Sequence, residues 1–255
     1  MDLREIPAQL GRRHPWEVAR ARFFSQTLGD DRSGRQPRAL LDVGAGDGYL
    51  SKEVLARFPA GSEMVCVDEH YTDPDLDRLG GGAARGMRFS RVVPARRFDV
   101  VLLLDVLEHV EDDVGFLRRL VADNLAPDGV ALVSVPAWPS LYTEHDRALR
   151  HHRRYRPAAC RALLAAAELD VLRSGGLFHA LLPVRALAAA REAVGRRLGW
   201  PARPPANLGE WRRGPLFSAV VERALRVDNA VSRRLADVGV PLPGLSFWAL
   251  AAHRR

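Results

Sequence analysis

The sequence A-L-L-D-V at 39–43, apolar except for Asp42, leads directly into three glycines at alternate positions, Gly44, Gly46 and Gly48, and a helical pattern begins at Tyr49. This order is typical of a buried strand, a tight turn and the start of a helix. Glycine lets the backbone turn sharply and approach a ligand, and the N–H groups at a helix start bind polar ligand atoms. The segment predicts a nucleotide-like ligand, with an ordinary ligand-free turn as the alternative.

The spacing Gly-x-Gly-x-Gly differs from the dinucleotide fingerprint Gly-x-Gly-x-x-Gly, whose helix receives a pyrophosphate. Two acids, Asp42 and Asp47, stand at the turn, where carboxylates repel a pyrophosphate and attract an ammonium or sulfonium group. A further acid, Asp68, closes the next apolar run, with Glu69 as the alternative. A carboxylate at that place in a doubly wound sheet accepts hydrogen bonds from ribose hydroxyls.

Apolar runs bounded by glycine, proline and aspartate alternate with helical patterns along the chain, which indicates βα units. We therefore predict a doubly wound α/β fold with a Rossmann-like, seven-stranded, mostly parallel sheet and an inserted helical pair before the last strand. The stretch 73–86 is polar and glycine-rich, and Pro-Asp-Gly at 127–129 predicts a turn. The predicted strands are 39–43, 63–67, 87–92, 98–104, 130–135, 170–173 and 245–252, and the predicted core helices are 49–58, 112–125 and 157–168.

The chain divides into four predicted parts. Residues 1–38 form an N-terminal cap helix and a linker, and residues 39–176 form the ligand-binding core. Residues 177–240 form a helical insert, and residues 241–255 hold the last strand. Within these parts we expect the cap helix at 16–28, the linker at 29–38, and insert helices at 178–198 and 216–238 joined by a link at 199–215.

The net charge is +7, from 38 basic and 31 acidic residues, and Lys52 is the sole lysine. A GC-rich coding sequence is the simpler explanation of the arginine bias, and an anionic partner is the alternative. Two cysteines are too few for a zinc cluster or a disulfide framework. The N-terminus shows no signal-peptide pattern and no apolar run is long enough to span a membrane, so we expect a cytoplasmic protein.

The predicted fourth strand ends in the sequence D-V-L-E-H at 105–109. Open α/β sheets bind ligands at the carboxyl ends of their strands, so these polar residues are expected beside the ligand. His109 is a candidate for substrate contact, and a structural role as a cap of the following turn is equally open.

DVGAGDG at 42–48, the acid in CVDEH at 66–70 and FDVVLLLDVLEHVEDD at 98–113 resemble the three main motifs of class I S-adenosylmethionine-dependent methyltransferases. The resemblance is specific over 39–135. In that family the glycine turn lies beside the methionine and ribose of the cofactor, the acid after strand two binds the ribose, and the segment after strand four lines the pocket. The resemblance implies S-adenosylmethionine as the cofactor, with contacts from Asp42, Gly44, Ala45, Gly46, Asp47, Gly48, Asp68, Glu69, Asp105, Val106 and Leu107.

One departure from the family concerns adenine. Many members carry an acid after strand three that holds the adenine amino group, whereas the sequence F-S-R-V at 89–92 supplies none. That contact is therefore open.

Histidines, carboxylates and aromatic residues crowd the segment from Trp138 to Tyr155, after the predicted fifth strand. Methyl transfer is an in-line displacement at a sulfonium carbon, so the protein must position the acceptor and remove a proton from a hydroxyl. His145 is the candidate base, with Asp146 to orient it. The segment also resembles the HD…GHxRRY pattern of some of these methyltransferases, with Arg150 in place of the glycine. The predicted catalytic residues are His145, Asp146, His151 and His109, and the predicted substrate contacts are His14, Trp16, Trp138, Tyr142, His152, Arg154 and Tyr155.

Other interpretations of these residues stay open. Histidines and carboxylates also suit zinc or a harder divalent ion, but adjacent His151 and His152 point different ways on a regular element, so no metal is predicted. Structural hydrogen bonding is a further alternative. Arg153 and Arg154 suit a phosphate or carboxylate of the acceptor, or salt bridges to the acidic helix at 112–123. The helix that holds His14 and Trp16 either closes over the cofactor or is anchored to the core by its tryptophan.

The sequence as a whole predicts an S-adenosylmethionine-dependent methyltransferase that acts on a small molecule, most simply on a hydroxyl oxygen of a sugar, lipid-linked or secondary-metabolite acceptor. The alternatives are an NAD(P)-binding oxidoreductase and a non-catalytic cofactor-binding or partner-binding subunit. The basic amphipathic insert helices fit an anionic or lipid-linked acceptor at a membrane surface, or plain packing. A nucleic-acid substrate is disfavoured, because no base-flipping Asn-Pro-Pro-Tyr motif is present. The oligomeric state is not indicated.

Overall fold

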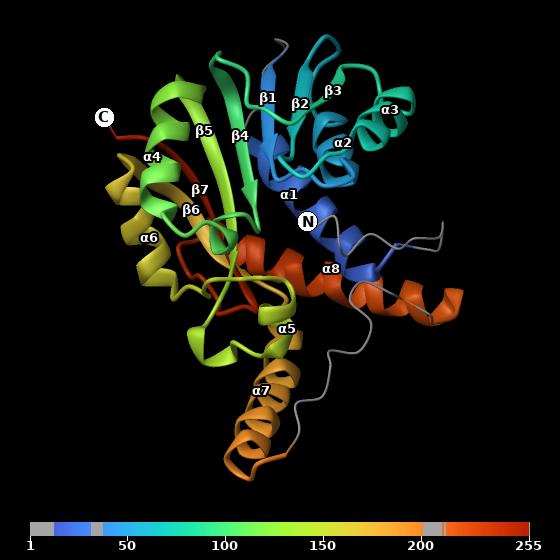
Figure 1. The fold of residues 1–255 in the computed structure, drawn as a ribbon, viewed down its shortest axis with the longest axis vertical. Helices are drawn as coiled ribbons and strands as arrows, with labels where there is room; N and C mark the ends of the chain where they lie inside the picture. Colours follow the sequence, from blue (N-terminus) through green and yellow to red (C-terminus); the bar gives the residue numbers. More distant parts are fainter. Residues whose placement is uncertain (1–12, 32–37, 201–210, 212, 255) are drawn as a thin grey trace.

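The computed structural model describes residues 13–31, 38–200, 211 and 213–254, without the side chains of residues 30 and 31. At its centre lies a seven-stranded sheet in the order β3-β2-β1-β4-β5-β7-β6 (Figure 1). β7 is antiparallel to both of its neighbours, and the other pairs are parallel. The predicted doubly wound, mostly parallel sheet is confirmed. The strands are β1 (Ala39–Val43), β2 (Glu63–Val67), β3 (Met87–Ser90), β4 (Phe98–Leu104), β5 (Leu125–Pro136), β6 (Leu169–Leu177) and β7 (Ser246–His253).

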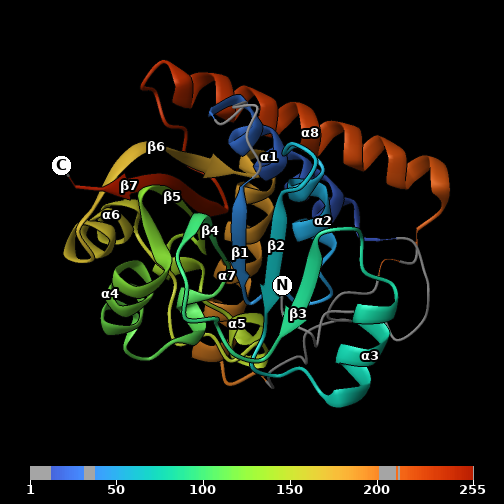
Figure 2. The same ribbon diagram turned by 90° about the horizontal axis from the view of Figure 1, so that it is seen from above.

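Helices cover both faces of the sheet (Figure 2). Successive side chains of a strand point to opposite faces, so a strand covered on both sides is apolar throughout. In β1, Leu40 packs with the face covered by α1, α2 and α8, whereas Leu41 packs with the face covered by α4 and α6. Both leucines are completely buried. These helices are α1 (Pro15–Asp31), α2 (Tyr49–Leu55), α4 (Asp113–Asn124), α6 (Pro157–Ala166) and α8 (Pro215–Asp237).

A helix without a sequence prediction, α3 (Asp73–Gly81), lies beside β3 within the polar stretch 73–86. It begins with a capping box, in which Asp75 donates its N–H to the Thr72 hydroxyl and accepts the Thr72 N–H with its carboxylate. Such a cap satisfies two backbone donors that the first helical turn leaves unpaired. The Thr-x-x-Asp spacing was the available signal, because the stretch has few apolar residues to show a helical period.

Several element boundaries differ from their predictions. α1 continues to Asp31, so the predicted linker at 29–38 begins as helix, and residues 32–37 lie outside the described part of the chain. α2 ends at Leu55, three residues before the predicted end. β5 begins at Leu125, because Phe98 of β4 pairs with it before the register shifts. The predicted turn at 127–129 is therefore an irregularity within a strand, and the other elements differ by a few residues at their ends.

The two helices of the predicted insert diverge in the structure (Figure 1). α8 packs along α1 and β6, and its Leu225 is buried. α7 (Leu182–Arg197) instead contacts the segment with the short helix α5 (Glu144–Ala148), where Glu144 donates its N–H to the Glu192 carboxylate at 3.1 Å. Most of the predicted link at 199–215 lies outside the described residues. Within the described ranges, no helix combines the length and apolar character needed to cross a bilayer.

Candidate functional site

A cavity of about 460 Å³ opens at the carboxyl ends of β1, β2 and β4, where sheets of this class bind ligands. β1 contributes Gly44 just beyond its end, β2 contributes Asp68, and β4 contributes Val106. The volume lies within the range of small-molecule pockets, about 300–1,000 Å³. The structure thus brings several predicted cofactor contacts to one cavity, including Glu69 and Asp105.

Two glycines of the turn have no room for a side chain. Gly44 has a φ of +73°, and a Cβ on it would lie 2.7 Å from Cγ2 of Val106. Gly48 has a φ of +72°, and its Cβ would lie 2.8 Å from the ring of Phe89. L side chains rarely adopt this backbone conformation. Because Gly44 lines the cavity, its missing side chain leaves room for a ligand, whereas Gly48 allows β3 to pack against the start of α2.

Asp68 is fixed at the end of β2 by the backbone around it. Its carboxylate accepts the N–H of Gly46 at 3.3 Å and the N–H of His70 at 3.0 Å. A carboxylate offers about four lone-pair sites, so these two donors leave capacity for a pair of ribose hydroxyls. The residues present fit the ribose of the expected cofactor. At the position after β3, where an acid was missing, Arg91 lines the cavity and its Nε donates to the carbonyl of Tyr71.

A second cavity, of about 30 Å³, shares Gly44 with the first and lies beneath α1. Arg20 of α1 forms an ion pair with Asp105 at the end of β4, with a distance of 2.9 Å between Nη2 and Oδ2. α1 therefore covers the turn and its carboxylates. The walls of this small cavity include Trp16, Arg20, Asp42, Ala45 and Asp47.

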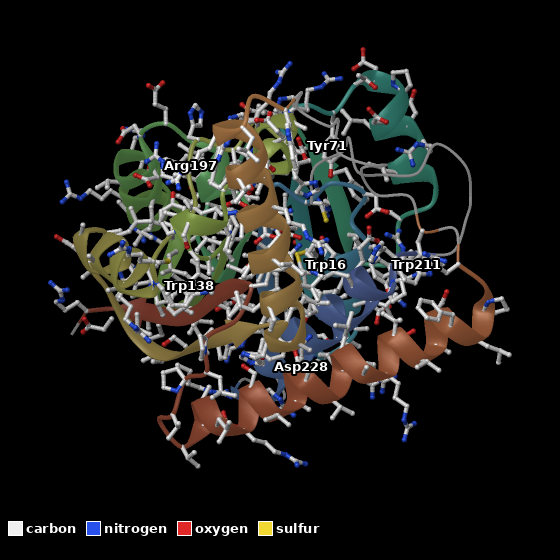
Figure 3. The ribbon with its side chains drawn as sticks, turned by 90° about the horizontal axis from the view of Figure 1, so that it is seen from below. Trp16, Tyr71, Trp138, Arg197, Trp211 and Asp228 are labelled. Atoms are coloured by element: carbon white, nitrogen blue, oxygen red, sulfur yellow. The ribbon has the colours of Figure 1, made fainter. Side chains whose placement is uncertain are left out.

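His14 and Trp16, both predicted to contact substrate, have different surroundings. Figure 3 shows Trp16 and Trp211, the ring that His14 contacts. Trp16 lines the small cavity and packs on Phe178, with ring centroids 5.7 Å apart. His14 packs edge-on against Trp211, with centroids 4.7 Å apart, and burial lowers its pKa. The prediction for His14 is corrected to a packing role, because a residue nearly two hundred positions away covers its ring.

Asp42 is a buried acid whose charge depends on pH near neutrality. The hydroxyl of Ser51 donates to its carboxylate at 2.6 Å. Burial raises the pKa of Asp42 to about 6, although the Ser51 hydrogen bond opposes that shift. A positive group bound in the small cavity would favour the ionised form of Asp42, so Asp42 would be ionised more completely with that group present than without it.

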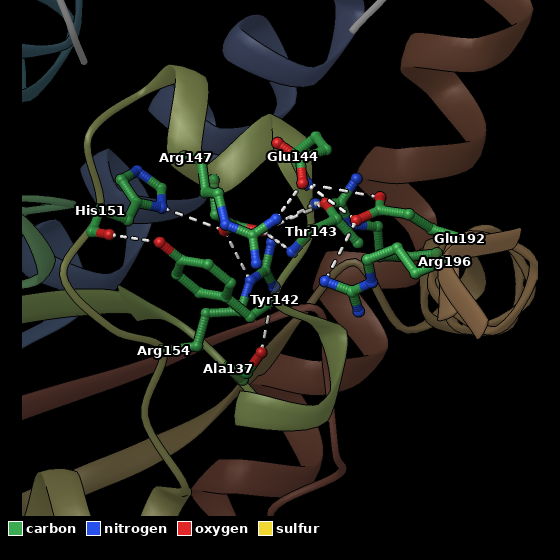
Figure 4. A network of polar contacts seen from close by, with 11 residues as sticks. Ala137, Tyr142, Thr143, Glu144, Arg147, His151, Arg154, Glu192 and Arg196 are labelled. Carbon is green, nitrogen blue, oxygen red and sulfur yellow. Dashed lines mark hydrogen bonds and ion pairs between the residues drawn. The ribbon is translucent and has the colours of Figure 1, made fainter. Parts of the chain in front are cut away.

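A polar network joins α5 to the following segment and to α7 (Figure 4). Asp146 lies at its centre, with His151, Arg154 and Arg185 as partners. Its carboxylate, which is completely buried, accepts from Nδ1 of His151 at 3.0 Å and from Nε of Arg154 at 2.7 Å. Nη2 of Arg185 and the N–H of Thr143 donate to the other oxygen, at 3.0 and 2.9 Å. Burial alone would raise the pKa of Asp146, but the His151 hydrogen bond and the Arg154 charge hold it well below its usual value. Asp146 is thus an anionic anchor.

The predicted pairing of His145 with Asp146 is wrong, because the carboxylate holds His151 instead. Neighbouring residues on a helix do not face each other, so α5 directs the two side chains apart. Burial, assisted by the charge of Arg185, lowers the pKa of His145 and keeps the ring neutral. Two other predicted site histidines, His109 and His152, line the large cavity.

Several other predicted contacts have structural roles. Leu107 is completely buried in the core between the sheet and α4, which corrects its assignment to the cofactor. Arg153 forms a salt bridge of 2.9 Å with Asp113 of α4, which is the predicted salt bridge to the acidic helix rather than a contact with the acceptor. Four predicted substrate contacts are corrected because their polar atoms bind the protein: Trp138 Nε1 donates to the Gly244 carbonyl at 2.8 Å, Tyr142 Oη to the His151 carbonyl at 2.7 Å, Arg154 Nη1 to the Ala137 carbonyl at 3.1 Å, and Tyr155 Oη to the Asp113 carboxylate at 2.7 Å.

Glu108, His109 and His151 come together beside the large cavity. Glu108 and His109 belong to the short helix η2 (Leu107–His109), and the ligand atoms of the three residues lie within 4.8 Å of one another. Glu108 is completely buried, and neither of its carboxylate oxygens has a hydrogen-bond partner. Burial, and then the charge of Asp105, raises its pKa well above the usual value.

Four side chains of this region were not predicted as site residues from the sequence: Arg20, Arg91, Glu108 and Arg185. Glu108 stands beside the predicted His109, so its position was visible in the D-V-L-E-H motif. The three arginines carried no signal, because they are three of many in an arginine-rich chain.

Comparison with known proteins identifies the family of this chain. The model of a family described as a methyltransferase domain matches residues 12–174. A ubiquinone biosynthesis O-methyltransferase from Azorhizobium caulinodans is 38% identical over 114 residues, which is 41% of this chain. The chain spans 44% of the length of that curated relative.

Solved structures share the fold at low sequence identity. The plantazolicin methyltransferase BpumL, in complex with a substrate analogue and S-adenosylhomocysteine, has a TM-score of 0.54 and 11% identity, covering 94% of this chain and 85% of its own. The [4+2]-cyclase SpnF has the same TM-score with 14% identity, covering 99% of this chain and 90% of its own. One architecture therefore carries different reactions, and the chemistry has to be argued from the site.

Proposed function

The chain belongs to the methyltransferase-domain family, the class I S-adenosylmethionine-dependent enzymes, and on this premise we propose that it methylates a hydroxyl oxygen of a small molecule. The observation that carries the proposal is a single cavity lined both by cofactor contacts, Gly44 and Asp68, and by two histidines, His109 and His152. The name of the curated relatives, which are O-methyltransferases, supports oxygen as the acceptor atom.

The residues divide between holding the cofactor and preparing the acceptor. S-adenosylmethionine supplies an electrophilic methyl group on a sulfonium. The Asp68 carboxylate would accept hydrogen bonds from the ribose hydroxyls of the cofactor, and the missing side chain of Gly44 would leave space for it. Asp42 and Asp47, in the small cavity beneath α1, attract the positive ammonium of the methionine part.

His152 is the proposed base, in place of His145. It lines the cavity and is exposed, so it can take the proton of an acceptor hydroxyl and pass it to water. As His152 takes the proton of the acceptor O–H, the oxygen would form its new bond to the methyl carbon that a bound S-adenosylmethionine would supply, and the electron pair of the broken S–C bond would stay on sulfur. The products are S-adenosylhomocysteine, the methyl ether and a proton held on His152.

The acceptor class is proposed from charge. Arg91, which also pairs with Asp73, and Arg150 line the cavity together with Asp68, Glu69 and Asp105. The two arginines are the groups there that would attract an anionic part of the acceptor. A lipid-linked acceptor suits the exposed apolar side chains of α8, which include Leu216, Val220 and Val227. A sugar or secondary-metabolite acceptor and a cytoplasmic location stay predictions.

Calorimetric titration with S-adenosylhomocysteine, and with NAD for comparison, tests the cofactor. Asp68→Asn removes one acceptor oxygen and a charge, so we expect its Kd to rise about 10–100-fold, since hydrogen bonds to charged groups contribute about 1.5–3 kcal/mol. Asp77→Asn, on the exposed face of α3, is the matched control. Binding of NAD in place of S-adenosylhomocysteine would overturn the proposal.

Transfer of labelled methyl from S-adenosylmethionine to a panel of hydroxyl-bearing small molecules, with and without an anionic group, tests the reaction. His152→Gln is expected to lower kcat by about 10²–10⁴-fold, the usual contribution of a general base, and His145→Gln to leave it nearly unchanged. The reverse order would restore His145 as the base. Labelling of amine-bearing but not hydroxyl-bearing compounds would contradict oxygen as the acceptor.

A further inference from the structure

The carboxylate of Glu108 has an unusual environment for an acid. It is completely buried, and both of its oxygens lack a hydrogen-bond partner. A buried carboxylate is strongly disfavoured unless a cation or hydrogen-bond donors compensate it. His109 and His151 lie next to this carboxylate, because the potential ligand atoms of all three residues are within 4.8 Å of one another. A cation bound between the three residues would compensate the charge of Glu108.

The two histidine rings lie beside each other, and a ring nitrogen of each lies within 4.8 Å of the other and of a Glu108 carboxylate oxygen. They meet edge to face, with centroids 4.7 Å apart and an interplanar angle of 84°. Nδ1 of His151 contacts the Asp146 carboxylate at 3.0 Å, which assigns the ring proton to Nδ1 and leaves the lone pair on Nε2. Histidines that bind metals typically donate their second N–H to a carboxylate in this way.

The backbone holds the two contributing segments in register. His152 donates its N–H to the carbonyl of Glu108 at 2.7 Å, and the Tyr142 hydroxyl donates to the carbonyl of His151, also at 2.7 Å. Asp146 is itself fixed by Arg154 at 2.7 Å. A site whose ligands are held by such contacts is organised before an ion arrives.

We propose that Glu108, His109 and His151 bind one divalent transition-metal ion, with Asp146 as the carboxylate that orients His151. Two histidines and one carboxylate form the ligand set of catalytic zinc and of non-haem iron, and both leave coordination positions open. His109 also lines the large cavity, so an open position faces it. An ion there lowers the pKa of a bound acceptor hydroxyl; this role rests on the proposed function, whereas binding of the ion does not.

Titration of chelator-treated protein with Co²⁺, followed by visible absorption and by elemental analysis of bound metal, tests the site without cofactor or acceptor. We expect one equivalent to bind with d–d bands of an N/O-ligated ion, and Zn²⁺ to displace it. Glu108→Gln and His109→Gln should each weaken metal binding at least about tenfold, because each variant loses one metal ligand. Loss of a residue that only hydrogen-bonds to a ligand already lowers metal affinity about 10–100-fold. His253→Gln, in β7, removes a histidine outside the cluster and should bind as the wild type does.

Wild-type protein that binds neither Co²⁺ nor Zn²⁺ at equimolar concentration would overturn the proposal, and Glu108 would then be a protonated core acid. Undiminished binding by the Glu108→Gln/His109→Gln double variant would also overturn it. Thermal unfolding confirms that each variant folds, and half-buried His109 provides the test if Glu108→Gln does not fold. Calorimetry with S-adenosylhomocysteine in excess chelator separates failure of the metal site from failure of the cofactor assignment.

Discussion

Arg20 of α1 and Asp105, just beyond β4, form an ion pair of 2.9 Å that ties the N-terminal helix to the ligand-binding edge of the sheet. Arg20 is 4% exposed, and it also donates to the hydroxyl of Ser134 at 3.2 Å. Ser134 in turn donates to Asp105 at 2.9 Å. This triad holds Asp105 at a φ of +61°, a conformation that few non-glycine residues adopt without support. Asp105 lines the large cavity and Arg20 lines the small one, so this ion pair joins the walls of the two cavities and holds α1 over them.

Arg20→Gln is expected to weaken cofactor binding, because it removes the ion pair with Asp105 that holds α1 over the cavities. We expect the Kd for S-adenosylhomocysteine to rise about tenfold, which corresponds to about 1.4 kcal/mol. Calorimetry measures the change, and Arg22→Gln, exposed on the same helix, is the control. Equal affinities of the two variants would show that α1 covers the small cavity without help from the Arg20–Asp105 ion pair.

Gly44→Ala is expected to abolish cofactor binding, because its Cβ would lie 2.7 Å from Val106 and its φ is +73°. Removal of the clash by Val106→Ala should rescue binding incompletely, since the backbone strain persists. Gly80→Ala, near the end of α3 with no atom close to its Cβ, should instead stabilise the fold by about 0.5–1 kcal/mol. Thermal unfolding and calorimetry together distinguish the two effects. Wild-type affinity in Gly44→Ala would show that the ligand does not approach this turn.

The affinity for S-adenosylmethionine is expected to increase as pH rises through about 6. The pKa of Asp42 is raised to about 6 by burial, so the carboxyl is neutral below that pH and attracts the ammonium group only above it. Calorimetry between pH 5 and 7.5 measures the change, at constant ionic strength. Asp42→Asn should remove this dependence. A wild-type Kd independent of pH would place the positive group elsewhere.

Asp146→Asn is expected to reduce the free energy of unfolding by about 3 kcal/mol, because removal of one partner of a buried ion pair leaves the other charges uncompensated. The pKa of Asp146 is lowered in the folded state, so its contribution is present above the unfolded pKa of about 3.9 and is lost as pH falls below it. The stability difference between wild type and variant should therefore be constant from pH 7 to about 5 and shrink in stronger acid. Urea unfolding at several pH values measures it. A constant difference down to pH 3 would contradict the lowered pKa.

Local sequence was sufficient for the strand–turn–helix at 40–49. The apolar run of a strand buried on both faces and the special backbone of glycine act over a few positions, so β1, the turn and the start of α2 were predictable. The same holds for Asp68 and Asp105, whose places follow from the strands that precede them. α3 was missed because its cap, rather than an apolar period, defines it.

The partners of the histidine-rich segment were not predictable. The sequence showed that His145, Asp146 and His151 are close along the chain, and it suggested the wrong pair. Only the fold turns His151 toward Asp146, brings Arg185 of α7 to the same carboxylate, and covers His14 with Trp211.

The sequence by itself determined the succession of the seven strands along the chain, the glycine turn, the acids beside it and the methyltransferase family, because each depends on residues that are close together in the chain. Tertiary structure decided that Arg20 closes on Asp105, that Asp146 is an anchor rather than the partner of a base, and that Glu108 meets two histidines in a buried cluster. The contacts of Arg20 with Asp105, of Asp146 with His151 and of Glu108 with His151 join residues 5 to 85 positions apart. Their formation depends on burial and packing, which act through space and leave no periodic trace in the chain.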